Sequence, residues 1–510
     1  MRFRPLAALA AVAVGLLTLT SAGANPSPPI PAASTFETKN LKAVGHSFFP
    51  NTPNLPGLTF TANSDLAFWG KLAFQGHYTG FRILDVSSSK NPKQISFTEC
   101  VGNQGDVVVW GDILVRSWNS PATGTGTSLL SCDGEPVPMG FEGLHVFDIS
   151  DLKDPELIGE VELSARPMAS RALQNGAIGC GSHTATLVPD KKNDRLLLYN
   201  QTSGGPCPFI SIIEIPLDAP EDAKWLRDEP LEEAGACHDS GVILGKVKML
   251  ACASHDHANV YSLGGKRGGS LEDPEFLYTI SEEGVCNEPG NPLCNGNWHS
   301  AAFTWDGKVI ILGWEPGGGS APECEATDPD VKKSWFFYDA KDGSKLGQFV
   351  LPRPQTAEEN CTIHNYNVVP TKKGYILVGG NYQAGISVVD FSKPSRAKEI
   401  AYADPAPLVP TQLGGDWSTY WYNGDIYQSD ITRGLLVWDL KKNIGKTEKL
   451  RHLNPQTNEF SFGGDKRGKD KDRDKDKDKK DRDKDKKDKD RDKDKDKDKK
   501  KKKKKKKDDD

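Results

Sequence analysis

Several features that mark common enzymes and membrane proteins are missing from this sequence. After residue 24 it has no apolar run of about 20 residues, the length that a helix needs to cross a bilayer. It also has no Cys-x-x-Cys pair, no nucleophile elbow, no phosphate-binding glycine loop and no zinc-protease helix. An enzymatic reaction therefore cannot be argued from a motif, and any site has to be sought in residues that recur along the chain.

The one long apolar stretch lies at the N-terminus. Arg2 and Arg4 precede it, it extends to about Leu19, and small residues follow up to Ala24. This order is typical of a secretory signal peptide, so residues 1–24 are expected to be cleaved. An uncleaved anchor is the alternative, but the apolar run is short for a membrane span. The ten cysteines fit a secreted protein, because disulfides persist outside the cytoplasm.

One short pattern occurs seven times along the chain. The clearest copies read GFRILDVSSSKNP (80–92), GLHVFDISDLKDP (143–155) and GISVVDFSKP (385–394), and GLLVWDL (434–440) is a shortened one. Three weaker copies begin at Phe209, Asn259 and Ser334. A unit repeated in this way indicates an array of similar structural elements.

Each unit has the composition of a four-stranded antiparallel sheet. Two short β-like runs joined by a polar turn precede the pattern, and a more polar run usually follows it after a proline. Seven such sheets packed radially predict an all-β fold, a seven-bladed β-propeller over residues 39–460, with a linker over 25–38. Residues 40–49 have the character of an outermost strand with no unit before them, so we expect them to complete the last blade.

The repeated pattern resembles the LVIVD repeat of bacterial secreted β-propellers. The similar positions are a glycine, alternating hydrophobic residues, an aspartate, a hydrophobic residue, a serine and then a proline. This resemblance implies a propeller outside the cytoplasm but no particular reaction. The aspartates at the end of the pattern are predicted to cap the following turns, with a functional ring of acids as the alternative. They are Asp85, Asp148, Asp339, Asp390 and Asp439.

The cysteines lie mostly in connections that a propeller places on one face. We predict disulfides within units, and the last four cysteines allow three pairings, of which 286–294 with 324–361 is preferred. The three pairs predicted within units are Cys100–Cys132, Cys180–Cys207 and Cys237–Cys252, and the last four residues are Cys286, Cys294, Cys324 and Cys361.

Histidines recur where the innermost strands of four successive units begin. They are His183, His238, His299 and His364, and the corresponding residues of the other units are Asp65, Asp106 and Asp416. The innermost strands begin at the mouth of the central channel, so these groups are candidate ligands for copper or zinc. Purely structural histidines are the alternative. His255, His257, Trp298 and Trp417 are expected at the same rim, where aromatic rings and carboxylates would suit a carbohydrate or peptide.

The C-terminal residues 461–510 differ in composition from the rest of the chain. From Asp465 onwards they contain 27 Lys and Arg and 18 Asp, a net charge of +9. The whole chain carries −5, so residues 1–464 carry −14. A segment without apolar residues cannot form a core, so we predict a disordered tail attracted to anionic cell-wall polymer or simply solvated.

The sequence favours an exported binding protein that acts at or outside the cell envelope, with an unknown protein, peptide or carbohydrate ligand. A copper- or zinc-dependent oxidoreductase with a histidine-lined site is the alternative. Nucleic acid is a poor candidate partner because the expected folded body is acidic and exported.

Overall fold

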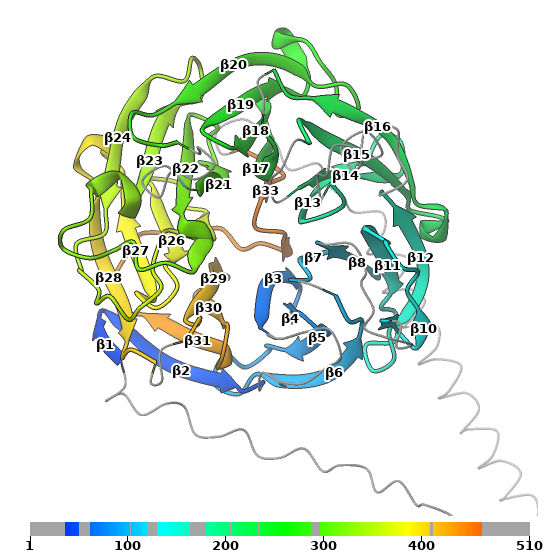
Figure 1. Cartoon of the computed structure of the whole chain (residues 1–510), viewed down its shortest axis with the longest axis horizontal. Coiled ribbons are helices and arrows are strands. Elements are labelled where there is room, and N and C mark those ends of the chain that lie inside the picture. Colours follow the sequence, from blue (N-terminus) through cyan, green and yellow to red (C-terminus); the bar gives the residue numbers. More distant parts are fainter. Residues whose placement is uncertain are drawn as a thin grey trace, which may run out of the picture.

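The computed structural model is a ring of seven four-stranded antiparallel sheets around a central channel (Figure 1). The seven-bladed propeller expected from the repeats is thereby confirmed. The structure describes residues 36–49, 62–102, 104–119, 130–163, 180–202, 207–232, 235–286, 296–408 and 412–461. The expected signal peptide and residues 462–510 of the expected tail lie outside these ranges. No helix among the described residues is long and apolar enough to cross a membrane.

Strands follow one another from the channel outwards in every blade. The innermost strands of blades 1 to 7 are β3 (Asn63–Trp69), β7 (Val107–Trp110), β13 (Thr184–Asp190), β17 (Cys237–Leu244), β21 (Gly296–Phe303), β25 (Tyr366–Val368) and β29 (Asp416–Tyr422). The second strands are β4 (Leu72–His77), β8 (Ile113–Trp118), β14 (Arg195–Gln201), β18 (Lys248–Ser254), β22 (Val309–Pro316), β26 (Ile376–Gly380) and β30 (Asp425–Asp430).

The third strands carry the repeated pattern. They are β5 (Gly80–Asp85), β11 (Gly143–Asp148), β15 (Phe209–Pro216), β19 (His257–Ser262), β23 (Ser334–Asp339), β27 (Ile386–Asp390) and β31 (Gly434–Leu440). The outermost strands are β6 (Lys93–Glu99), β12 (Glu156–Glu162), β16 (Lys224–Pro230), β20 (Glu275–Ser281), β24 (Lys345–Val350), β28 (Lys398–Pro405) and, for blade 7, β2 (Leu41–Ser47). Connections contain the hairpin β9 (Ser131–Cys132) and β10 (Glu135–Pro136), and the 3₁₀ turns η2 (Pro220–Asp222), η3 (Gly265–Arg267), η4 (Gly317–Gly319), η5 (Asp330–Lys333) and η6 (Pro394–Arg396).

The N-terminal strands close the ring. β2 pairs antiparallel with β31, which confirms the expectation that these residues complete the last blade. β1 (Phe36–Lys39) adds a fifth strand to blade 6 by pairing with β28. Between them Asn40 adopts a φ of 57°, a conformation that asparagine tolerates well, and its amide donates to the carbonyl of Ile400 at 2.8 Å. One short segment therefore joins blades 6 and 7.

The C-terminal segment covers the end of the channel where the innermost strands end. Residues 447–461, called the plug below, contact the inner part of every blade, and Figure 1 shows this segment crossing the centre of the ring. β32 (His452–Leu453) pairs with β3 of blade 1, and β33 (Thr457–Asn458) pairs with β17 of blade 4. Hydrogen bonds and one β-bridge join the plug to the remaining blades. The hydrogen-bonded pairs are Asn454 with Val109, Thr457 with Leu187, Asn458 with Phe303 and Leu450 with Asn423, and the bridge joins Thr447 to Thr371.

Apolar side chains fill the spaces between neighbouring blades. Phe81 and Phe147 meet between blades 1 and 2 with ring centroids 4.9 Å apart, and Phe337 stacks on Phe391 between blades 5 and 6 at 4.6 Å. Each third strand supplies apolar residues to both sides, which is why its sequence reads as a nearly continuous hydrophobic run.

The aspartates that end the third strands cap turns, as the sequence predicts. Asp439 is the exception, since its carboxylate contacts the ammonium group of Lys441. In the other four cases Oδ1 accepts the N–H of the residue two positions on: Asp85 from Ser87 (2.8 Å), Asp148 from Ser150 (2.7 Å), Asp339 from Lys341 (2.9 Å) and Asp390 from Ser392 (3.0 Å).

Four predicted disulfides are present. They are Cys100–Cys132, Cys180–Cys207, Cys237–Cys252 and Cys324–Cys361. The expected partner of Cys286 is Cys294, which lies outside the described residues.

Candidate functional site

A one-residue irregularity at the start of several innermost strands determines which side chains face the channel. The pairing of β17 with β18 shifts between Cys237 and Asp239, which leaves His238 as the extra residue. The same shift makes His299 the extra residue in β21 and Trp417 the extra residue in β29. A β-bulge turns the extra side chain away from its normal alternation. His238, His299 and Trp417 therefore point into the channel.

Four imidazoles form a continuous row around the channel mouth. The ring centroids are 4.3 Å apart for His183 and His238, 4.4 Å for His238 and His299, and 4.3 Å for His299 and His364. All four side chains are buried. The structure thus brings together histidines that are about 60 residues apart in the sequence.

Two carboxylates that sequence reasoning missed lie against this row. Glu315, the last residue but one of β22, has Oε2 3.9 Å from His299 Nε2 and Oε1 3.5 Å from His364 Nε2. Asp239 has Oδ1 3.7 Å from His238 Nδ1 and Oδ2 3.9 Å from His299 Nδ1. The sequence offered one signal for Glu315, because it is the acidic residue near the end of the apolar run VIILGWEP. This run is the second strand of its blade, and the end of a second strand lies at the same rim as the start of the innermost strand.

The outer two histidines have a defined tautomer. His183 Nδ1–H donates to Asn119 Oδ1 at 2.7 Å, and His364 Nδ1–H donates to the carbonyl of Trp417. A hydrogen bond from Nδ1 leaves the lone pair of Nε2 free to bind an electrophile. These partners are the kind that orient metal-binding histidines.

Burial sets the charge of the row. It lowers the pKa of His183 and His299 well below the usual value, with the neighbouring imidazoles adding to the effect, and it lowers the pKa of His364 to about 4. Burial also acts against protonated His238, but Asp239 and Glu315 outweigh it and raise its pKa. Burial raises the pKa of Glu315 to about 7. The imidazoles of His183, His299 and His364 are therefore neutral, which is the form of histidine that binds metals.

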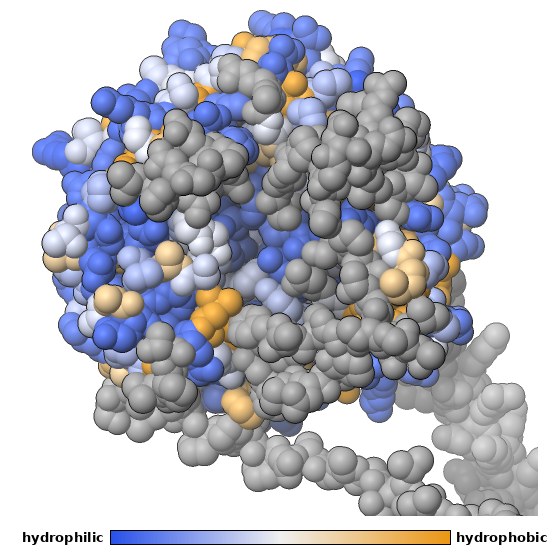
Figure 2. All heavy atoms as spheres, viewed as in Figure 1, coloured by the Kyte–Doolittle hydropathy of each residue, from blue (hydrophilic) through white to orange (hydrophobic). Residues whose placement is uncertain are grey.

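The row lines a cavity of about 260 Å³ at the channel mouth. Figure 2 shows the ring along its axis, with mostly hydrophilic residues around the central hollow. One side of the wall carries the histidines of blades 3 to 6 and another carries the carboxyl groups of blades 1 and 2. Besides the groups already named, the lining includes Ser64, Asp65, Tyr78, Asp106, Asn365, Tyr382 and Trp417.

Four residues expected at the rim lie elsewhere, so those expectations are corrected. Asp416 precedes the bulge of β29 and is buried away from the cavity, where it accepts a hydrogen bond from Thr419. Trp298 precedes the bulge of β21 and packs in the core against Phe336, with ring centroids 5.3 Å apart. His255 and His257 flank Asp256 at the β18–β19 turn and do not line the cavity.

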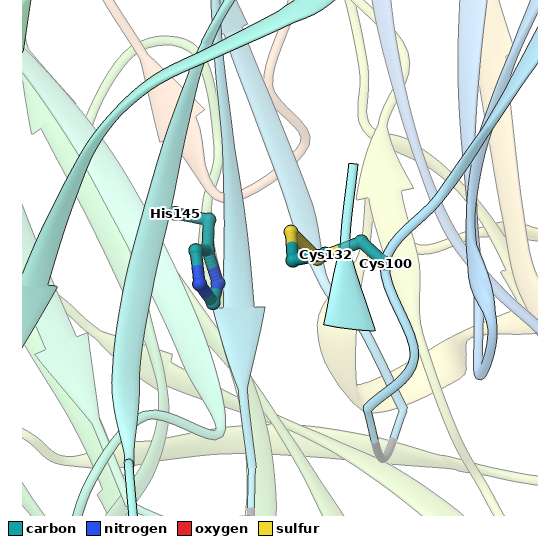
Figure 3. A group of neighbouring side chains, drawn as sticks. All are labelled: Cys100, Cys132 and His145. Carbon is teal, nitrogen blue, oxygen red and sulfur yellow. A yellow bond between two sulfur atoms is a disulfide. The ribbon is translucent and has the colours of Figure 1, made fainter. Parts of the chain in front are cut away.

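A second cysteine–histidine group is structural. His145 lies close to the sulfurs of Cys100 and Cys132 (Figure 3). These sulfurs are bonded to each other, so neither is the thiolate that a metal requires. The aromatic rings of Trp118 and Phe141 enclose the imidazole. This group therefore belongs to the core between blades.

No protein-family model and no curated protein matches the chain. Solved structures that resemble it include the Dos1 propeller (9% identity, 80% of this chain and 85% of that chain, TM-score 0.45). The computationally designed protein Ika8 covers 78% of this chain and 100% of its own at 10% identity and TM-score 0.39. The match to Raptor of Chaetomium thermophilum covers 81% of this chain and 30% of Raptor, at 10% identity and TM-score 0.43. Similarity at these identities concerns the fold alone.

Proposed function

We propose that this protein is an exported β-propeller that binds a copper or zinc ion at the channel mouth. The observation that carries the proposal is the group formed by His238, His299 and Glu315. One donor atom from each lies within 4.8 Å of the others, and all three side chains are buried. Two imidazoles and a carboxylate are a donor set that zinc and copper take in proteins.

The residues around this group fit an ion as well. His238 Nδ1, His299 Nδ1 and Asp239 Oδ1 are buried without a hydrogen-bond partner. Unsatisfied buried polar atoms are costly, and an ion or its ligands would satisfy them. His183 and His364 flank the group with Nε2 available. A bound ion supplies Lewis acidity, or electron transfer in the case of copper.

The cavity favours a small ligand over a polymer. Its histidines and carboxylates are only 2–7% exposed, so an extended peptide or polysaccharide on the surface would not reach them. Trp417, Tyr78 and Tyr382 add aromatic surface beside His364, which suits a compact organic molecule. Whether such a ligand is only bound or also oxidised depends on the ion, and the oxidoreductase therefore remains the second candidate.

Export is supported by the four disulfides and by the N-terminal sequence. The proposal also includes that the seven repeats are LVIVD repeats, on the basis of their sequence similarity.

Metal analysis of the purified secreted protein tests the metal site. We expect about one copper or zinc per chain, reduced at least tenfold in His299→Ala and in Glu315→Gln. His255→Ala, which removes a histidine of blade 4 outside the cavity, should keep the full amount. Equal metal content in all four proteins, or none in the wild type after incubation with either ion, would contradict the proposal.

A further inference from the structure

The wall formed by blades 1 and 2 contains a second arrangement of ionisable groups. Asp65 and Asp106 both line the cavity and are 3% and 5% exposed. Their carboxyl groups are within hydrogen-bonding reach of each other. Neither takes part in an ion pair with a lysine or arginine among the described residues. Two adjacent buried carboxylates without a cation cannot both be ionised.

The hydrogen bonds around the two groups are unequal. Asp65 Oδ1 accepts from Ser418 Oγ at 2.5 Å and from Tyr420 Oη at 2.6 Å, and Asp65 Oδ2 accepts from the plug residue Gln456 at 3.2 Å. Asp106 Oδ2 accepts one N–H, that of Ala185, at 3.0 Å. Several donors stabilise a carboxylate, so Asp65 is the better place for the negative charge.

The other oxygen of Asp106 is where a proton fits. Asp106 Oδ1 is buried and accepts no hydrogen bond from the described residues. A proton on this atom removes the repulsion from Asp65 and provides a donor. Burial, and then the charge of Asp65, raise the pKa of Asp106 well above its usual value, in agreement with this assignment. The other titratable groups facing the pair are Tyr420 of β29, Asp239 of β17 and His183, which precedes β13.

We propose that Asp65 and Asp106 hold a single proton between them and present it to the cavity as an acid–base pair. The ligand that this subsite takes is a small molecule with an oxygen or nitrogen lone pair that can accept the proton. In the transfer, the O–H bond of Asp106 breaks and an O–H or N–H bond forms on the ligand. The pair then regains a proton from water at the channel mouth. The inference does not require a bound ion, although the proposed metal site would hold the other end of the same ligand.

Infrared difference spectroscopy on the metal-free protein tests the pair. Wild type minus Asp106→Asn should show the carbonyl band of a protonated carboxylic acid, measured above pH 7 so that Glu315, whose pKa is about 7, contributes little. The band should shift in D₂O within the mixing time, because the group lines a cavity. Asp416→Asn is the matched control, since the pKa of buried Asp416 is also raised well above its usual value. Its band should exchange more slowly, because Asp416 does not line the cavity.

A second variant keeps the test informative if Asp106→Asn fails to fold. Asp65→Asn leaves Asp106 in place but removes its negative neighbour, so the Asp106 band should disappear at lower pH than in the wild type. Absence of a band assigned to Asp106, or a midpoint unchanged by Asp65→Asn, would overturn the proposal.

Measuring zinc binding together with the infrared band distinguishes this inference from the proposed function. Asp106→Asn should lose the band and still bind zinc, whereas His299→Ala should lose zinc and keep the band. Loss of the band on adding zinc or calcium to the wild type would show that the pair binds a cation instead of a proton, and would also overturn the proposal.

Discussion

Two buried histidines outside the cavity, His77 and His145, contribute to the response of the folded protein to acid. Burial lowers the pKa of His77 and His145 to about 3, and Arg116 contributes to both shifts. An unfolded histidine has a pKa of about 6.5, so below that pH the unfolded chain takes up protons that the folded chain does not. The stabilisation is complete above pH 6.5 and is lost progressively as the pH falls towards 3.

We expect His145→Phe to flatten this acid response. At pH 5 one such histidine costs the folded state about 2 kcal/mol relative to neutral pH. Phenylalanine does not titrate and fits beside Trp118 and Phe141, whose centroids lie 5.5 and 4.8 Å from the imidazole. Denaturant unfolding at pH 8 and pH 5 measures the effect. If the free energy of unfolding falls by the same amount in variant and wild type, this explanation of the acid response is wrong.

At the scale of single elements, the plug makes a clear contribution to stability. Leu450 and Leu453 are buried in it, and full burial of a leucine contributes about 1.5–3 kcal/mol. Asn454 adds two hydrogen bonds of 2.9 Å to the backbone of Val109. The plug also reaches the acid pair through Gln456.

Truncation after residue 445 should therefore lower the melting temperature by at least several degrees. Truncation after residue 464, which removes only the charged segment, is the matched control and should leave it within about one degree. Differential scanning calorimetry of the two truncated proteins and the full chain makes the comparison. Similar melting temperatures for all three would show that the plug is dispensable.

The repeats made the blades predictable, but they did not make the β-bulges predictable. Seven copies of one pattern, each preceded by a hairpin, specify the number of blades and which strand is innermost. The sequences ACHDS and GGDWS do not reveal that the extra residue is His238 in one and Trp417 in the other. A register shift of one residue depends on pairing with the next strand, so Asp416 was wrongly placed at the rim and Trp417 rightly.

The partners of the histidines were harder to predict than the histidines themselves. Glu315 comes from a second strand, so it does not share their position in the repeat. The plug was not predicted either, because its short polar stretches pair with several blades at once and have no strand pattern of their own.

At the scale of the whole molecule, charge is divided between the folded body and the C-terminus. Cleavage after residue 24 would remove Arg2 and Arg4, which would leave −16 on residues 25–464 against +9 on residues 465–510. The plug ends at Ser461, whose hydroxyl accepts the N–H of Lys246 at the β17–β18 turn, on the face opposite the histidines. Ser461, the last described residue of the plug, therefore lies on the side away from the cavity mouth.

We expect deletion of residues 465–510 to weaken retention on an anionic cell surface without changing metal content. Exposed ion pairs contribute only about 0–1 kcal/mol each and are screened over about 8 Å at physiological salt. Washing with high salt should therefore release the full-length protein. Equal retention of both forms at low salt would contradict a role of this segment in attachment.

Anomalous X-ray diffraction at the copper or zinc absorption edge is the decisive test of the proposed metal site. In crystals grown with the metal, we expect one strong peak at the channel mouth, within about 2.0–2.2 Å of nitrogen atoms of His238 and His299 and an oxygen of Glu315. An anomalous map with no peak in this cavity, or with peaks only on the outer surface of the ring, would contradict it.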